Sequence, residues 1–232
     1  MLSFLWRWTW RLVAAALVAV LLVQCWFLGH IWWWKDHPPS ATAFMRDRLA
    51  GLQVKDPKAK LRQRWVPYER ISANLKRAVI AAEDGKFLDH DGFDWEAIEK
   101  AHEKNRKKGK IVSGASTISQ QLAKNLFLSG SRTWWRKGQE AVITLMLEQV
   151  LDKRRILEIY LNVIEWGEGV FGAEAAALHY FGRPASQLTR EQAARLAAMI
   201  PRPRFFDRNR ASPWLERHTG VILGRMNASQ VP

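Results

Sequence analysis

The chain has 232 residues, with 36 lysines and arginines against 22 aspartates and glutamates, and a formal net charge of +14. This length allows one sizeable domain plus an appendage. The single cysteine, Cys25, excludes an intramolecular disulfide framework. The positive charge is compatible with nucleic acid, anionic lipid or a phosphate-bearing substrate, and it does not by itself choose among these partners.

The N-terminal region predicts a membrane anchor. Residues 12–28 are apolar apart from Gln24, and the apolar run continues through Ile31–Trp34, about the length that crosses a bilayer as a helix. Tryptophans mark both ends of the run, as they do at the two interfaces of a membrane. No small-x-small cleavage site follows, and Gln24 before Cys25 does not fit a lipoprotein signal. We therefore expect an uncleaved signal anchor.

The charges around this run predict its orientation. Arg7 and Arg11 precede it on the short side, which favours a cytoplasmic N-terminus. The rest of the chain would then be exported, because long domains translocate largely regardless of their charge. We expect a cytoplasmic segment at 1–11, a transmembrane helix at 12–34, a stiff proline-containing linker at 35–41 and a periplasmic globular domain at 42–232.

The globular domain is predicted to be mainly α, because it contains no alternating apolar and polar run typical of a strand. Capping residues and helix breakers divide it into helices that begin at Ser72, Asp94, Ser113, Thr133, Asp152, Ala173, Thr189 and Ser212. Gly85 is the expected stop of the first of these helices. The second runs into a basic segment, Lys104–Lys110, that we expect to be mobile.

Glu83 and Asp84 lie where the first helix of the domain is expected to end. The helix macrodipole disfavours negative charge at the last turn, so a carboxylate held there is expected to have a raised pKa. A raised proton affinity suits a general base. Two ordinary solvated acids at a helix end are the alternative that the spacing leaves open.

The helix expected at 113–128 has two faces of different chemistry. An apolar stripe contains Ile118, Leu122, Ala123 and Leu126. The opposite arc carries hydrogen-bonding groups and a single cation, namely Ser116, Thr117, Gln120, Gln121, Lys124 and Asn125. A groove that reads sugar hydroxyls and amides, with one cation for an anion, has this composition. A polar face that packs beneath another segment of the chain has the same composition.

Cationic side chains follow this helix. Arg132, Arg136 and Lys137 precede Glu140, and positions 136 and 140 are one helical turn apart. A weak surface salt bridge is one interpretation. The other is a clamp for pyrophosphate, made of these cations and Lys124 and positioned by Glu140.

Other residues give weaker signals. His90 has no second ligand at metal-site spacing, so a structural role is the simpler interpretation and no metal site is predicted. There is no glycine-rich phosphate loop and no serine nucleophile elbow. Trp134 and Trp135 are placed to reach the membrane interface, which would keep the site near a lipid-borne substrate.

Four motifs, taken in order, resemble the glycosyltransferase family 51 domain of peptidoglycan synthases. They are Glu83-Asp84-x-x-Phe87-x-x-His90-x-Gly92, Gly114-Ala-Ser116-Thr117-Ile-Ser-Gln120-Gln121-Leu-Ala-Lys124-Asn125, Arg136-Lys137-x-x-Glu140 and Lys153-x-x-Ile-Leu-Glu158-x-Tyr160-Leu161-Asn162. The resemblance runs from about Thr42 to near the C-terminus and departs mildly at Ala115 and Ser119. The length, the single anchor and the absence of a following penicillin-binding domain favour the monofunctional biosynthetic transglycosylases of this family.

The resemblance implies a lysozyme-like fold with a small membrane-facing jaw. It implies polymerisation of lipid II into a β-1,4-linked glycan, with inversion and release of undecaprenyl pyrophosphate, at the bacterial inner membrane. The expected partners are lipid II, the growing lipid-linked glycan, the membrane and proteins of cell-wall synthesis or division, and not nucleic acid. No cofactor is expected to be required, although a divalent cation such as Mg²⁺ could stimulate the reaction.

The resemblance also assigns roles to residues. Glu83 would be the general base, and Glu140 the second catalytic acid, which supports the cations. Lys124 and Arg132 would bind the donor's pyrophosphate, with Arg136 and Lys137 nearby. The remaining substrate-binding residues would be Ser116, Thr117, Gln120, Gln121, Asn125, Asp84, Phe87 and His90. The fourth motif is expected to hold the fold together, with Glu158 paired.

Other function classes fit parts of this pattern. A lysozyme-like hydrolase would also place a glutamate at a helix end, but as an acid that protonates the departing oxygen. Such an enzyme would have no use for cations such as Lys124 and Arg132. A non-catalytic, membrane-anchored scaffold would use the positive charge on lipid headgroups and would not depend on Glu83. DNA binding is the weakest alternative, because the basic segment is short and the domain is expected to be exported.

Overall fold

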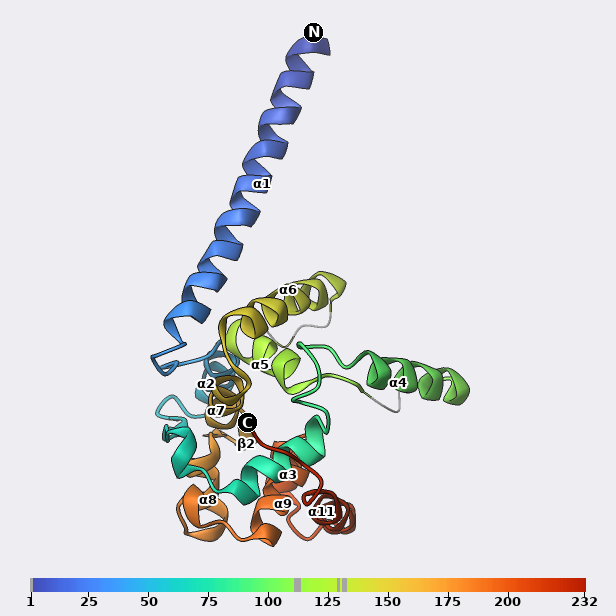
Figure 1. Cartoon of the computed structure of the whole chain (residues 1–232). Helices are drawn as coiled ribbons and strands as arrows, with labels where there is room; N and C mark the ends of the chain where they lie inside the picture. Colours follow the sequence, from blue (N-terminus) through green and yellow to red (C-terminus); the bar gives the residue numbers. More distant parts are fainter. Residues whose placement is uncertain (1, 111–113, 129, 131–132) are drawn as a thin grey trace.

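The structure is a computed structural model that describes residues 2–110, 114–128, 130 and 133–232. One long helix, α1 (Leu2–Trp33), projects from a helical body (Figure 1). The helices of the body are α2 (Ala43–Gln53), α3 (Ala73–Glu83), α4 (Trp95–Lys108), α5 (Ile118–Phe127), α6 (Trp134–Val150), α7 (Lys153–Val163), α8 (Ala173–Phe181), α9 (Arg190–Met199), α10 (Pro203–Arg208) and α11 (Pro213–Arg225). The prediction of a mainly α domain is confirmed.

Side-chain caps fix where most of these helices begin. Helices were expected to begin at Ser72, Asp94, Thr133, Asp152 and Thr189, and the side chain of each accepts a hydrogen bond from a first-turn backbone N–H. These bonds satisfy N–H groups that have no partner inside the helix.

Two predicted helix boundaries are wrong. The helix expected from Ser113 begins at Ile118, because Thr117 and Gln120 form a capping box that starts it there. The helix expected to stop at Gly85 ends at Glu83, with Asp84 as its cap. Gly85 does not have a positive φ. Asp84 instead leaves the helix because its carboxylate accepts the backbone N–H of Ile118 at 2.9 Å.

A small sheet, which was not predicted, lies beside the helices. Its strands are β1 (Arg62–Gln63), β2 (Glu165–Gly167) and β3 (Val170–Phe171), in the order β1-β3-β2. β1 pairs with β3 in parallel, and β2 pairs with β3 antiparallel. Strands of two or three residues are too short for an alternating pattern to be recognised. The turn at Gly169 has φ +70°, a conformation that favours glycine.

The last turns of α1 are part of the folded body. Phe27, Ile31 and Trp34 are buried, and the ring centroids of Phe27 and Trp34 lie 4.9 and 5.1 Å from that of Phe127. Gln24 in α1 and Gln139 in α6 exchange amide hydrogen bonds of 3.0 and 3.1 Å. The anchor helix is therefore packed against α5 and α6 rather than loosely tethered to them.

The predicted linker at 35–41 is held on the body at its start. The guanidinium of Arg155 donates hydrogen bonds to the carbonyl oxygens of Trp34 and His37, at 2.9 and 2.8 Å. The N-terminal part of α1 projects freely. Within α1, the stretch Trp8–Trp33 is long and apolar enough to cross a membrane, and only 6% of its most apolar 18-residue segment is buried.

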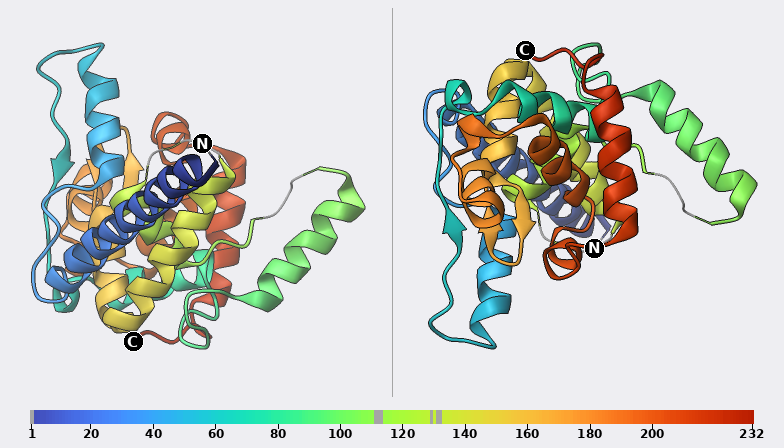
Figure 2. Two further views of the ribbon diagram at one scale, coloured as in Figure 1. Left: turned by 90° about the horizontal axis from the view of Figure 1, so that it is seen from above. Right: turned by 90° about the horizontal axis from the view of Figure 1, so that it is seen from below.

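The basic segment that was expected to be mobile is largely helical. α4 continues through Lys108 and ends at Gly109, which has φ +63°. Both views of Figure 2 show α4 extending away from the rest of the body. None of its basic side chains lines the groove described next.

Candidate active site

Glu83 is the last residue of α3, and its carboxylate faces α5. The side-chain amide of Gln121 donates a hydrogen bond of 2.7 Å to Glu83 Oε2. The hydroxyl of Tyr160, in α7, donates to the amide oxygen of Gln121 at 2.8 Å. Because Tyr160 occupies the amide oxygen, the amide N–H of Gln121 is held toward Glu83. Three helices thus orient one carboxylate.

Tyr160 is a site residue that the sequence reasoning assigned only to the fold. It is fully buried in α7, beside apolar neighbours such as Ile156 and Leu157. A buried tyrosine hydroxyl needs a hydrogen-bond partner. That requirement was the available signal, but the sequence could not show that the partner would be Gln121.

Burial raises the pKa of Glu83 above its ordinary value, and the negative charge of Asp84 raises it further. The hydrogen bond from Gln121 and the positive charge of Lys124 act in the opposite direction. The predicted direction of the shift is confirmed. Its main cause is loss of solvent rather than the helix dipole.

Replacing Gln121 with leucine is expected to move the acid limb of the activity profile to higher pH. The hydrogen bond lowers the pKa of Glu83, so its loss raises that pKa further. Only the carboxylate form accepts a proton, and activity is lost as pH falls through the pKa. Initial rates measured from about pH 4 to about pH 9, a range that covers both the protonated and the ionised form of the Glu83 carboxyl, test this prediction. Gln53→Leu, which removes an exposed amide that does not line the groove, should leave the limb in place, and a limb that moves to lower pH would contradict the assignment.

Asp84 joins the end of α3 to the start of α5. Besides accepting the Ile118 N–H, it accepts a 2.9 Å hydrogen bond from Nε2 of His90. The backbone N–H of Gly92 donates to Nδ1 of His90, so Nε2 carries the proton of a neutral ring. The Thr117 hydroxyl donates to the carbonyl of Gly92 at 2.7 Å. This network sets the distance between Glu83 and α5.

Phe87 and His90 lie behind the site rather than on its walls. Phe87 is buried, with the Lys153 ammonium 4.8 Å from its ring centroid. Lys153 also donates to the carbonyl of His90 and to Glu148. Neither Phe87 nor His90 lines the cavities described below, so the structure does not bring these two predicted substrate-binding residues to the groove.

Three cavities meet at Gln121 of α5, and two of them are also lined by Glu83. The central cavity, of about 360 Å³, is lined by Glu83, Ser116, Gln120, Gln121, Lys124, Arg136, Lys137 and Glu140. The α11 cavity, of about 580 Å³, shares Glu83 and Gln121 with it and extends past Asp84 and Thr117 to Trp214. The α2 cavity, of about 430 Å³, shares Gln121, Lys124 and Arg136 and extends past Asn125 and Tyr160 to Phe44. The shared residues make one groove.

The groove contains most of the predicted site residues. Those that line it are Glu83, Asp84, Ser116, Thr117, Gln120, Gln121, Lys124, Asn125, Arg136, Lys137 and Glu140. Arg132 lies outside the described residues. Two predicted groove residues also have structural roles, because Thr117 and Gln120 cap α5 through each other.

Glu140 is buried between two cations of its own helix. It is 3% exposed and accepts a 2.7 Å hydrogen bond from Arg136, and Lys137 contacts its other oxygen. The interpretation as a surface salt bridge is therefore wrong. Nε of Arg136 is buried and has no hydrogen-bond partner among the described residues. Arg136 also lines the central cavity, so its positive charge lies beside a ligand bound there.

The arrangement places a proton acceptor and a set of cations on one cavity. Glu83, Lys124, Arg136 and Lys137 all line this cavity. A hydroxyl that loses its proton to Glu83 could attack a carbon whose leaving group is an anion held by the cations. In the described part of the chain, no three His, Cys, Asp or Glu side chains group as a metal site would require.

Comparisons with known proteins identify the family. The family described as Transglycosylase matches residues 51–227. Proteins named biosynthetic peptidoglycan transglycosylase are similar over nearly the full chain. The one from Nitrosospira multiformis is 62% identical over 226 residues, which cover 97% of this chain and 98% of that protein. The one from Chromobacterium violaceum is 61% identical over 222 residues (96% and 97%), and the one from Dechloromonas aromatica 59% over 232 residues, all of both chains. The chain therefore belongs to the transglycosylase family, whose lysozyme-like, mainly helical domain is a glycosyltransferase of peptidoglycan biosynthesis.

Proposed function

We propose that this protein polymerises lipid II into β-1,4-linked glycan strands, with inversion at the donor's anomeric carbon and release of undecaprenyl pyrophosphate. The observation that carries the proposal is the central cavity, in which Glu83 faces Lys124, Arg136 and Lys137. A general base and a cationic clamp are what a sugar acceptor and a pyrophosphate leaving group need. The names of the relatives agree with this chemistry.

The proposed reaction has one proton transfer and one displacement. Glu83 takes the proton of the 4-hydroxyl of the acceptor's GlcNAc, and that oxygen attacks C1 of the donor's MurNAc. The bond from C1 to the pyrophosphate oxygen breaks, and the pyrophosphate keeps the electron pair. Lys124, Arg136 and Lys137 stabilise the new negative charge. Glu140 holds Arg136 and Lys137 in place. No general acid is required, because the leaving group is already a weak base.

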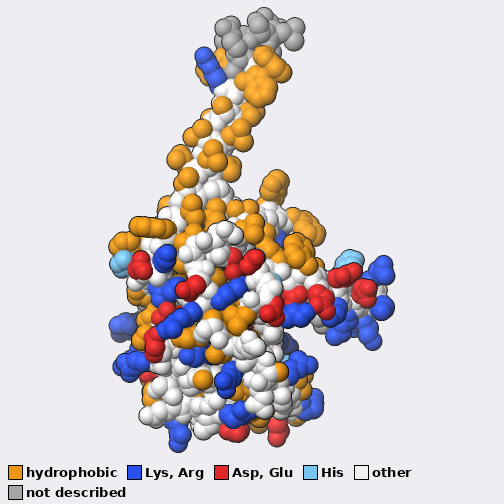
Figure 3. All heavy atoms as spheres, viewed as in Figure 1, with side chains coloured by type: hydrophobic (Ala, Val, Ile, Leu, Met, Phe, Trp, Pro, Cys, Tyr) orange, Lys and Arg blue, Asp and Glu red, His pale blue; other side chains and the backbone are white. Residues whose placement is uncertain are grey.

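The surface near α1 fits a site that works at a membrane. Figure 3 shows apolar side chains on α1 and on the adjoining part of the body, where α6 lies in Figure 1. Trp134 and Trp135 of α6 are each 91% exposed. Exposed tryptophans of this kind favour the interface of a bilayer. We infer a single-pass anchor in the inner membrane, with Arg7 and Arg11 on the cytoplasmic side and the groove on the periplasmic side.

We propose no cofactor requirement and no transpeptidase activity for this chain. A divalent cation such as Mg²⁺ would stimulate the reaction by pairing with the pyrophosphate. Proteins of cell-wall synthesis or division are the protein partners we expect near the membrane.

The proposal is tested with the full chain in detergent. Labelled lipid II should be converted to long glycan that lysozyme degrades. Preformed glycan without a lipid pyrophosphate should remain intact, because the protein has no activated donor to use. Shortening of the preformed glycan, with lipid II left untouched, would instead identify a hydrolase or lyase in which Glu83 acts as an acid.

A further inference from the structure

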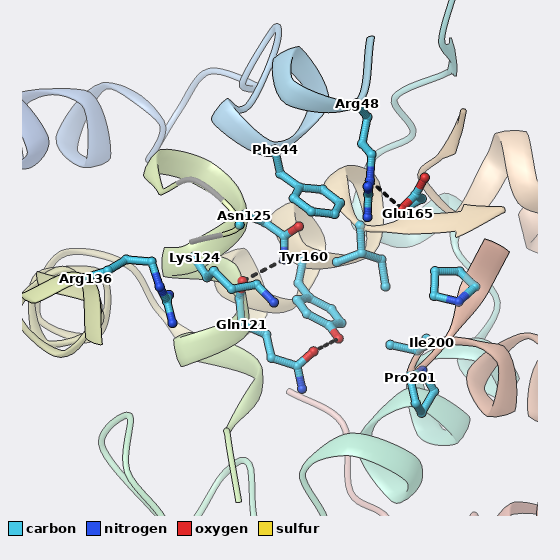
Figure 4. A pocket seen from close by; sticks show the side chains of 13 residues that line it. Phe44, Arg48, Gln121, Lys124, Asn125, Arg136, Tyr160, Glu165, Ile200 and Pro201 are labelled. Atoms are coloured by element: carbon cyan, nitrogen blue, oxygen red, sulfur yellow. Dashed lines mark hydrogen bonds and ion pairs between the residues drawn. The ribbon is translucent and has the colours of Figure 1, made fainter. Parts of the chain in front are cut away.

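A second polar site lies at the end of the α2 cavity that is remote from Glu83. Arg48, in α2, and Glu165, in β2, form an ion pair in the wall, with Nε of Arg48 3.1 Å from Oε2 of Glu165. Figure 4 shows this pair on the side of the cavity opposite Arg136, with Tyr160 between them. The reaction described above uses neither Arg48 nor Glu165.

The second oxygen of Glu165 receives no hydrogen bond of normal geometry from the described residues. The side chain is 4% exposed, and Oε1 is buried without a hydrogen-bond donor among the described residues. The backbone N–H of Gly169 acts on the carboxyl as a weak hydrogen-bond donor, and Arg204 acts through its charge, but Oε1 receives no hydrogen bond of normal geometry from either. Buried polar atoms are almost always hydrogen-bonded, so such an oxygen suggests a donor that the protein itself does not supply.

The surroundings of the pair are open rather than filled. Besides the α2 cavity, Glu165 and Arg48 line a cavity of about 570 Å³ along α10 and a smaller one of about 100 Å³. A purely structural ion pair would be enclosed by packed side chains. Here three cavities border one residue, so a small rotation of the Glu165 side chain would bring Oε1 to a ligand in the groove.

The position of the pair indicates the ligand. The α2 cavity begins at Lys124 and Arg136, where the proposed function places the donor's pyrophosphate. A polyprenyl tail would not be favoured against a buried carboxylate. Sugars carry hydroxyl and acetamido N–H groups, which are the donors that Oε1 lacks. The rings of Phe44 and Tyr160 line the same cavity and offer the flat surfaces against which sugars pack.

We propose that Glu165 Oε1 accepts a hydrogen bond from a saccharide of the donor glycan behind the reacting MurNAc, and that Arg48 holds the carboxylate in place for it. The inference rests on the proposed function, because it assigns a subsite of the same groove. Glu165 is then a substrate-positioning residue for the growing strand, separate from the residues that handle the proton and the pyrophosphate.

The groove beyond the pair suits the rest of the strand. The cavity along α10 is lined by Arg202, Arg204 and Arg208 as well as by Arg48. The stem peptides on each MurNAc end in carboxylates, which guanidinium groups bind well. A strand that leaves the donor site past Glu165 would meet these cations next.

The test uses a donor that cannot act as acceptor. A lipid-linked tetrasaccharide whose terminal 4-hydroxyl is capped is joined to ordinary lipid II by the full-length protein in detergent. Loss of a hydrogen bond to a charged group corresponds to about a tenfold to hundredfold change in binding. Glu165→Ala should raise the KM for the capped donor at least about tenfold, with kcat and the KM for the acceptor changed less than about threefold. Glu165→Gln, which keeps a carbonyl acceptor, should show a smaller rise.

Glu174→Ala is the matched control. Glu174 is also a buried glutamate, whose carboxylate accepts the backbone N–H of Ala185, and it does not line the groove. This variant should lower the melting temperature and leave the donor KM unchanged. If Glu165→Ala does not fold, Glu165→Leu removes the same acceptor while filling the space of the side chain, and the same rise in the donor KM is expected.

The outcomes separate the two proposals. A donor KM that does not change, or one that changes together with the acceptor KM and the melting temperature, overturns the role of Glu165 and leaves the polymerase intact. If the wild type does not join the capped donor to lipid II, the proposed function is wrong and the role of Glu165 is wrong with it.

Discussion

Replacing Glu83 with glutamine is expected to lower the initial rate of lipid II polymerisation at least about 100-fold, the usual minimum contribution of a general base. Glutamine has nearly the same shape and can still accept the hydrogen bond that Gln121 donates to Glu83. The fold and the groove should therefore persist, while the ability to take a proton is lost. Steady-state rates with labelled lipid II, beside circular dichroism spectra of both proteins, provide the measurement.

Glu99→Gln is the control for this experiment, because Glu99 is an exposed acid on α4 that does not line the groove. It should retain the wild-type rate within about twofold, as expected for a surface change outside the site. A Glu83→Gln protein that polymerises at the wild-type rate would remove Glu83 from the reaction. It would also leave the raised pKa of that carboxyl without a catalytic meaning.

The sequence motifs predicted which residues form the site more accurately than local capping signals predicted where its helices begin and end. Glu83, Lys124 and Arg136 meet in one cavity, as the ordered motifs implied. Their meeting depends on the contact between α3 and α5, which are separated along the chain by α4. The helix stop at Gly85 was wrong because the local signal competed with Asp84, whose partner on α5 is 34 residues away. Local rules describe a helix end only where no such partner exists.

The sheet and the subsite at Glu165 could not have been predicted. β2 and β3 are too short for a periodic pattern, and Arg48 and Glu165 are 117 residues apart. A single glutamate in an apolar segment gives no indication of which cation will reach it. For Tyr160, the burial of the side chain could be predicted from the sequence, but its hydrogen bond to Gln121 on another helix could not.

Ile31→Ala, near the end of the anchor helix, is expected to lower the free energy of unfolding of the whole domain by about 2–5 kcal/mol, the usual range for truncating a buried isoleucine. If α1 were joined to the domain only by a flexible linker, Ile31 would contact lipid. It is instead fully buried among side chains of the body. Leu22→Ala is the matched control, because Leu22 is 65% exposed on the projecting part of α1. Thermal unfolding of the full chain in detergent, followed by near-ultraviolet circular dichroism, should show a fall on the order of 10 °C for Ile31→Ala and almost none for Leu22→Ala. Equal effects of the two substitutions would mean that the anchor is only a tether and that the catalytic domain is stable without it.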